Sequence, residues 1–288
     1  MDLQRQPGCF DLNDRAAKLT ALGDPLVTLK AEIDFEAFRV DLTRVHHKPR
    51  KRNAGATPFD VVLMFMVLIL QHLYHLSDDG LEYQMRDRLS FMRFLGLQME
   101  DRVPEAKTVW LFRERLKALG LVAVLFARFH NQLARRGYVA KSGQMIDATF
   151  IEVPRQRNSR AENTKIKAGE APEGWDDPAK APMRRQKDTD ARWTKKNNES
   201  HYGYKNHINA DAATKLIQDD VVTPSPVHDS QVIDAMLDTE TTTDHDRKRP
   251  VYADSAYRSA EREAALAAQG LASHLHEKGT RSAALTDE

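Results

Sequence analysis

The stretch GQMIDATFIEV, residues 143–153, places one acidic residue inside an otherwise apolar run. Its β-branched and aromatic residues are typical of a β-strand. One face of this strand would carry Met145, Asp147, Thr149 and Ile151, and the other would carry Ile146, Ala148 and Phe150. Because both faces are largely apolar, we predict a central strand covered on both sides. Burying even a neutral unpaired polar group costs roughly 2–7 kcal/mol, so Asp147 requires hydrogen-bond donors, a cation or a metal ion.

A second acid, Asp254, ends the apolar part of VYADSAYRS, residues 251–259. Two carboxylates brought together at one sheet edge repel each other unless one is protonated or a cation lies between them. Mg²⁺ and Mn²⁺ prefer oxygen ligands and leave room for phosphate oxygens, and two such ions can clamp a phosphoryl displacement. For either aspartate alone, a turn or a helix cap is the commoner role. The pair favours a shared metal site, with the carboxylates of Asp147 and Asp254 within about 5–6 Å of each other.

The residues around these two acids predict an α/β region over 141–288. Strands are expected at 143–153, 201–211, 215–223, 249–254 and 271–278, and helices at 229–238 and 259–270. Residues 154–200 contain few aliphatic side chains, so we expect a mobile insertion that buries too little apolar surface to order itself.

The first half of the chain predicts an all-α domain over residues 1–140. Apolar residues at helical spacing predict helices at 24–45, 57–75, 78–89, 104–120 and 121–137. Thr57 is the expected N-cap of the second of these helices, with Pro58 at its first position. The pair 104–137 is a candidate helix-turn-helix reader of DNA.

The charge, cysteine content and apolar runs of the chain exclude several classes of protein. The formal charge is only +1, but residues 44–52 hold five Lys/Arg, and residues 155–207 hold 13 Lys/Arg against 8 Asp/Glu, which favours nucleic acid over a solvated surface. The single cysteine, Cys9, excludes an intramolecular disulfide framework. The ten apolar residues 61–70 are too short to span a bilayer, and the N-terminus does not resemble a signal peptide, so we expect a cytoplasmic protein outside the membrane. The sequence contains no Gly-rich phosphate-binding loop, so we expect no nucleotide cofactor.

Four motifs in order resemble a known family: IDAT at 146–149, YGYKNHINAD at 202–211, DS at 229–230 and YADSAY at 252–257. They resemble the catalytic domain of DDE transposases from bacterial insertion sequences, in particular the IS-five-like group. PEAKTVWLFRERL (104–116) and residues 57–96 resemble the segments that precede that domain in the family. The resemblance covers nearly the whole chain from about residue 20.

The resemblance implies a ribonuclease-H-like mixed sheet with flanking helices, and Mg²⁺- or Mn²⁺-dependent DNA cleavage and strand transfer. It also implies that Asp147 and Asp254 are the first two acids of a catalytic triad. The third acid of the family is a glutamate on a later helix, and no residue here matches it, because Glu261 and Glu263 follow the second acid too closely. We therefore expect a domain that is incomplete at its C-terminus and cleaves DNA poorly.

Further residues are candidates for contact with double-stranded DNA. In the family reading Lys205 meets a phosphate near the metal site, although a solvent-facing edge lysine is an equal alternative. His207, on the same face, is expected to hydrogen-bond or pack, since imidazole suits Mg²⁺ less well than carboxylate. Tyr257 and Arg258 follow the second acid and are further DNA candidates. The remaining candidates are Arg50, Lys51 and Arg52 in the basic arm.

Three functions stay open on these observations. The favoured one is a transposase, which must hold two DNA ends together and is therefore expected to be a homodimer. The second is a catalytically inactive remnant that still binds DNA, and the third is a metal-dependent nuclease on the same fold.

Overall fold

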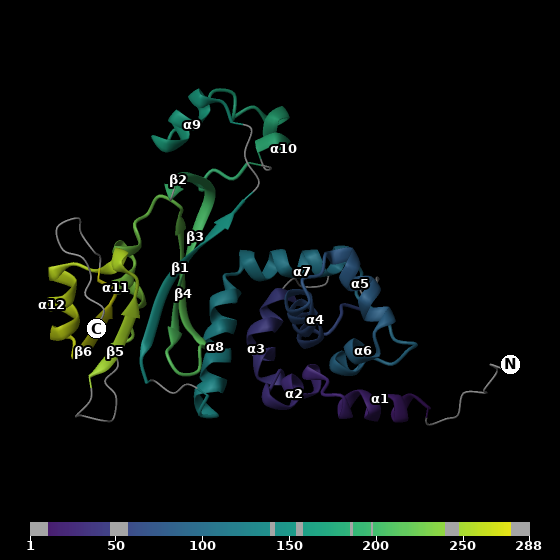
Figure 1. Cartoon of the computed structure of the whole chain (residues 1–288). Coiled ribbons are helices and arrows are strands. Elements are labelled where there is room, and N and C mark those ends of the chain that lie inside the picture. The colour runs from purple at the N-terminus through teal and green to yellow at the C-terminus, as the bar shows by residue number, and fades with distance from the viewer. Residues whose placement is uncertain are drawn as a thin grey trace. The chain divides into compact units, whose positions relative to one another are not determined.

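The computed structural model describes residues 11–46, 57–138, 142–153, 158–184, 187–196, 198–239 and 248–277. The chain divides into two compact units, Met1–Arg136 and Gly137–Glu288. The first unit is helical and the second contains the sheet (Figure 1). Basic-arm residues Arg50, Lys51 and Arg52 lie outside the described residues.

The first unit is built from helices, as predicted, but from more and shorter ones. They are α1 (Asp11–Ala21), α2 (Pro25–Glu32), α3 (Arg39–Leu42), α4 (Val61–Leu73), α5 (Asp78–Asp87), α6 (Leu89–Leu95), α7 (Ala106–Ala118) and α8 (Leu121–Arg135), with 3-10 turns η1 (Glu36–Phe38) and η2 (Thr43–His46). Their core includes Phe38, Leu42, Leu70, Leu81, Met85, Phe91, Phe94, Val109 and Leu121, each at most 2% exposed. Among the described helices, none is by itself long and apolar enough to cross a bilayer; α4 and α5 reach the length only together, with a bend of 106° between them.

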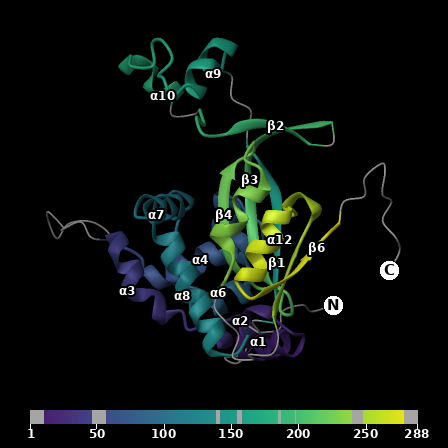
Figure 2. The ribbon, with the colours of Figure 1, turned by 90° about the vertical axis from the view of Figure 1, so that its left-hand side faces the viewer.

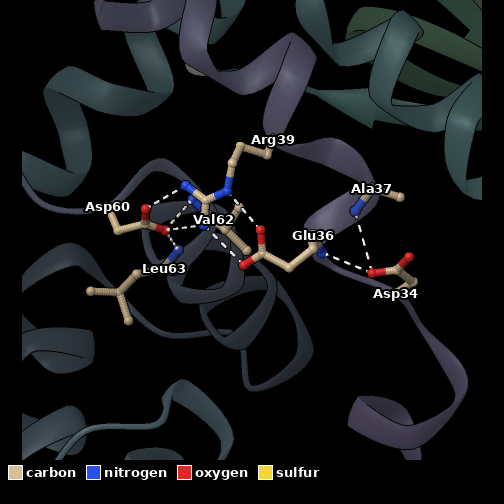
Figure 3. A network of polar contacts seen from close by, with 7 residues as sticks. All are labelled: Asp34, Glu36, Ala37, Arg39, Asp60, Val62 and Leu63. Atoms are coloured by element: carbon tan, nitrogen blue, oxygen red, sulfur yellow. Dashed lines mark hydrogen bonds and ion pairs between the residues drawn. The ribbon is translucent and has the colours of Figure 1, made fainter.

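The single helix predicted over 24–45 is wrong, because the chain breaks after α2. Ile33 adopts an extended conformation, with φ −113° and ψ 123°. Asp34 then starts a new turn, since its carboxylate accepts hydrogen bonds from the backbone N–H groups of Glu36 and Ala37 (Figure 3). A local carboxylate that competes for backbone donors thus overrides the apolar periodicity.

Asp60, rather than the predicted Thr57, caps α4. Its Oδ1 accepts hydrogen bonds from the N–H groups of Val62 and Leu63, at 2.9 and 3.1 Å. The same carboxylate accepts from the guanidinium of Arg39, which also pairs with Glu36 (Figure 3). Asp60 therefore starts α4 and also ties it to α3.

The second unit contains a six-stranded mixed sheet in the order β2-β3-β1-β5-β6, with β4 paired to β3. Its strands are β1 (Gln144–Glu152), β2 (Arg192–Lys196), β3 (Glu199–Asp211), β4 (Ile217–Pro224), β5 (Arg249–Ala253) and β6 (Leu271–Leu275). The strand β1 pairs antiparallel with β3 and parallel with β5, which pairs parallel with β6. All five predicted strands are present, and the predicted α/β class is confirmed.

Helices flank this sheet on its core face. They are α11 (Ile233–Met236) and α12 (Ala260–Ala268), with the 3-10 turns η4 (Asp229–Gln231) and η5 (Ser255–Tyr257). Figure 2 shows α12 lying over the strands. Residues from α11 and α12 form one buried cluster with Ile146, Val251 and Ala253.

The prediction that β1 is covered on both sides is wrong within this unit. Met145 and Ile151, on the face opposite the core cluster, are 37% and 43% exposed. Asp147 is exposed on that same face. Apolar composition on both faces of a strand therefore did not require that both faces be covered.

The insertion over 154–200, expected to lack regular structure, contains helices and a strand. Helix α9 (Arg160–Lys167) starts with a capping box between Ser159 and Glu162, and η3 (Pro178–Lys180), α10 (Ala181–Arg184) and β2 follow. Lys187 pairs with Glu162 and lies 5.4 Å from the ring centre of Trp175. Polar caps and one aromatic contact supply the local order that aliphatic burial does not.

Gly203 makes the close approach where β3 passes β1. Its φ of +148° is rare for residues with a side chain, and an added Cβ would lie 2.1 Å from the carbonyl oxygen of Ile151. We expect Gly203→Ala to lower the free energy of unfolding by about 2–3 kcal/mol, because backbone must move to relieve the overlap. Urea denaturation measures this effect, with Gly169→Ala as a control, since no atom lies within 4 Å of the Cβ built there although its φ is also positive. Equal losses in the two variants would show that backbone strain alone, and not the contact with β1, explains the effect.

Candidate active site

The sheet brings Asp147 and Asp254 to neighbouring positions on one face. The parallel pairing of β1 and β5 runs from Gln144 opposite Val251 to Ile146 opposite Ala253. The next residue on each strand is Asp147 and Asp254, and alternation puts both on the face away from the core cluster. Both side chains belong to exposed residues. Residues 107 positions apart in sequence thus meet at one place on the sheet.

Each carboxylate is held by one backbone hydrogen bond. Asp147 Oδ1 accepts from the N–H of Ala148 at 2.7 Å, and Asp254 Oδ1 accepts from the N–H of Ala256 at 2.8 Å. Asp254 is the N-cap of η5, the role that strand-end aspartates commonly take. In the part of the chain that the structure describes, the Oδ2 atoms of both aspartates accept no hydrogen bond. Capping therefore orients Asp254 and leaves an oxygen available.

The donor set of this face suits a hard divalent cation. Among the described residues, no group of three or more His, Cys, Asp or Glu side chains could hold a metal ion. Mg²⁺ commonly takes only one or two protein carboxylates and fills its other positions with water and substrate phosphates. Asp147 and Asp254 fit that pattern and are the residues that would hold the ion.

Lys205 lies on the other face of the sheet, in a buried ion pair. Its partner in β1 is Phe150, whereas that of Asp147 is Ile208, so Lys205 and Asp147 point to opposite faces. Its ammonium donates to Asp229 Oδ1 and to the carbonyl oxygen of Val227, each at 2.8 Å. The alternative of a solvent-facing edge lysine is wrong, because β3 is paired on both sides and Lys205 is 9% exposed.

Asp229 is the buried partner that sequence reasoning missed. It lies in η4, and only 10% of its side chain is exposed. An aspartate at the start of a helix ordinarily indicates a cap, and the DS motif carried no other signal. In fact the preceding His228 caps η4, by accepting a hydrogen bond from the N–H of Ser230.

Tyr257 is a core residue and not a surface contact. It is 1% exposed, belongs to the buried cluster, and its hydroxyl has no hydrogen-bond partner among the described residues. Burial, followed by the negative charges of Asp229, Asp147 and Asp254, raises the pKa of this hydroxyl well above its usual value. The charges of aspartates from both faces of the sheet therefore act on this hydroxyl. Its burial corrects the prediction that Tyr257 touches DNA.

Arg258 and His207 occupy two different environments. Arg258 pairs with Glu263 and Glu277, at 3.3 and 2.8 Å, so a DNA phosphate would have to compete with two carboxylates. His207 is completely buried, and its Nε2 lies 2.9 Å from the hydroxyl oxygen of Thr223. Burial lowers the pKa of His207 and favours the neutral ring. The prediction that His207 is a hydrogen-bonding and packing residue is confirmed.

Comparison with known protein families gives two matches along the chain. Residues 14–115 match a family described as Transposase domain (DUF772), and residues 140–282 match one described as Transposase DDE domain. No solved structure matches the chain significantly. The second match spans the mixed sheet with its flanking helices, which agrees with the predicted ribonuclease-H-like fold. Since the two matches follow one another over most of the chain, and the second brings two aspartates together on one face of its sheet, the chain belongs to the DDE transposases.

Proposed function

We propose that this transposase, of the IS-five-like group, cleaves phosphodiester bonds at the ends of an insertion sequence and joins the freed ends to target DNA. The observation that carries the proposal is the adjacent placement of Asp147 and Asp254 on an exposed sheet face. Both residues would hold Mg²⁺ or Mn²⁺. When bound, such an ion would polarise a phosphate oxygen and lower the pKa of the attacking hydroxyl or water.

The residues of this chain have separate tasks in that proposal. Asp147 is oriented by its strand and Asp254 by its cap on η5, so neither carboxylate has to be ordered when the substrate binds. The pair of Lys205 and Asp229 lies across the sheet and acts as a support for the strands rather than as a ligand of DNA. In the strand-transfer step, a DNA 3′ hydroxyl forms a new P–O bond while the target's own P–O bond breaks and leaves a hydroxyl.

Double-stranded DNA is the substrate that the family implies. We assign its recognition in part to the helical unit, where α7 and α8 form the candidate reader, and to the basic arm at residues 50–52. Holding two DNA ends during transfer favours a homodimer, and a bacterial insertion-sequence transposase would act on DNA in the cytoplasm.

The test uses a supercoiled plasmid that carries the genomic DNA flanking this gene on both sides. We expect slow nicking that requires Mg²⁺ or Mn²⁺, stops with EDTA, and is lost in Asp147→Asn. DNA binding without any metal-dependent nicking would instead favour the inactive remnant, and nicking without joined products would favour the nuclease. Equal nicking by wild type and Asp147→Asn would reject the proposed site.

A further inference from the structure

The insertion of the second unit contains a groove that the proposed catalytic site does not use. It has a volume of about 560 Å³ and lies between α9 and the strands β2 and β3. Its side chains include the cations Arg160, Lys167 and Arg192 and the aromatic residues Trp193 and Tyr202. Register places this groove beyond the end of β1, where Glu152 lies opposite Gly203 and Arg192 lies on the other side of Gly203.

The lining of the groove carries three cations against the one carboxylate of Asp188, so its net charge is positive. Among the described residues, neither Arg160 nor Lys167 forms an ion pair with an acid. Arg192 donates to the backbone carbonyl oxygens of Thr189 and Ala191, which fix the guanidinium without cancelling its charge. The carboxylate in the lining, Asp188, already accepts hydrogen bonds from the hydroxyl of Tyr204 and from two backbone N–H groups.

An aromatic pair lies beside these cations. Trp193 and Tyr202 are register partners on β2 and β3, and their ring centres are 5.0 Å apart. Tyr202 is buried at 8% exposure, whereas Trp193 remains 48% exposed. An indole held against a buried tyrosine is a rigid apolar group against which a deoxyribose can pack at little entropic cost. Exposed Lys195, two positions after Trp193, extends the cationic surface along the same strand face.

We propose that this groove, lined by Arg160, Lys167, Arg192 and Trp193, binds the phosphate backbone of the duplex DNA substrate. Interleaved cations and an exposed aromatic residue fit a nucleic-acid backbone, because the cations contact the phosphates while the ring packs on the sugars. The charge complementarity identifies the ligand as a polyanion, and the family supplies the duplex. The inference rests on the proposed function in its choice of DNA as ligand.

The experiment measures equilibrium binding of a fluorescent 30-base-pair duplex in EDTA, over a range of salt concentrations. Because EDTA removes the metal, this assay measures DNA binding without metal-dependent nicking. Loss of binding in the groove variants would therefore test the groove, and loss of nicking in the earlier plasmid assay would test the proposed catalytic site. The double variant Arg160→Gln/Lys167→Gln is expected to bind about tenfold more weakly. Its plot of log affinity against log salt is expected to be less steep by about 2, since each lost phosphate contact removes about 0.9 from the slope.

Matched controls make the result specific to the groove. Lys248→Gln removes an exposed cation at the opposite end of the sheet, next to β5, and is expected to leave affinity and slope unchanged. Trp193→Ala is expected to weaken binding by up to about tenfold without changing the slope, and Trp193→Phe to recover most of that loss. Unchanged affinity and slope in the Arg160→Gln/Lys167→Gln variant would overturn the proposal, as would an equal loss in Lys248→Gln.

Discussion

The single substitutions Asp147→Asn and Asp254→Asn are each expected to lower the affinity of the protein for Mn²⁺ by at least about tenfold. Each is also expected to lower the rate of metal-dependent nicking by roughly 10²–10³-fold. The exchange keeps the side-chain shape, and the amide oxygen still accepts the backbone hydrogen bond that each aspartate accepts now. It removes a negative charge and a hard oxygen donor from the shared face. Calorimetric titration with Mn²⁺ measures the first effect, and plasmid nicking measures the second.

The matched control for this experiment is Glu199→Gln. Glu199 is an exposed acid at the start of β3, nine residues along that strand from Ile208, the partner of Asp147. We expect its removal to leave Mn²⁺ affinity unchanged. If the Asp147→Asn and Asp254→Asn variants also bind Mn²⁺ as the wild type does, the two aspartates do not share a metal site.

The substitution Lys205→Met is expected to lower the free energy of unfolding by about 3–5 kcal/mol, the usual effect of removing one partner of a buried ion pair. The side chains of Lys205 and Asp229 are 11% and 10% exposed, so the remaining carboxylate would stay charged and buried or would have to take up a proton. The carbonyl oxygen of Val227 would also lose its donor. Urea denaturation followed by circular dichroism measures the loss.

Two further variants separate the ion pair from a general effect of losing a lysine. Lys195→Met removes an exposed lysine on the neighbouring strand β2 and is expected to change stability by less than about 0.5 kcal/mol. The double variant Lys205→Met/Asp229→Leu removes both charges and is expected to recover much of the stability, because no unpaired charge stays buried. A Lys205→Met protein as stable as the wild type would contradict the buried ion pair.

Local chemistry explains why much of this protein could be read from its residues. The strands of the second unit were predictable because β-branched runs end at turn residues, and both signals act within a few positions. The helix predicted over 259–270 starts at a residue that commonly caps helices, because Ser259 accepts a hydrogen bond from the N–H of Arg262. At the start of α4 the cap is Asp60, which lies only three residues after the predicted cap, Thr57.

For the candidate site, too, some features could be predicted from the sequence and others depend on the tertiary structure. Each of Asp147 and Asp254 could be picked out alone, since an acid inside or at the end of an apolar strand needs an explanation. Their common face depends on the parallel pairing of β1 and β5, which is a property of the sheet and not of either strand. The order of the insertion at 154–200 was not predicted, because it depends on contacts such as that between Lys187 and Glu162, which lie 25 residues apart in the sequence.

The sequence by itself determined the fold class, the five predicted strands of the second unit with the two helical segments between them, and the two acids, because these follow from the period of apolar residues and from single-residue turn and cap preferences. Only the tertiary structure decided which side chains are buried together. Lys205 pairs with Asp229, 24 residues further along the chain, and Tyr257 is buried in the core cluster, because burial and long-range pairing depend on which face of each strand the helices cover. An alternating pattern marks two faces but does not say which of them is covered.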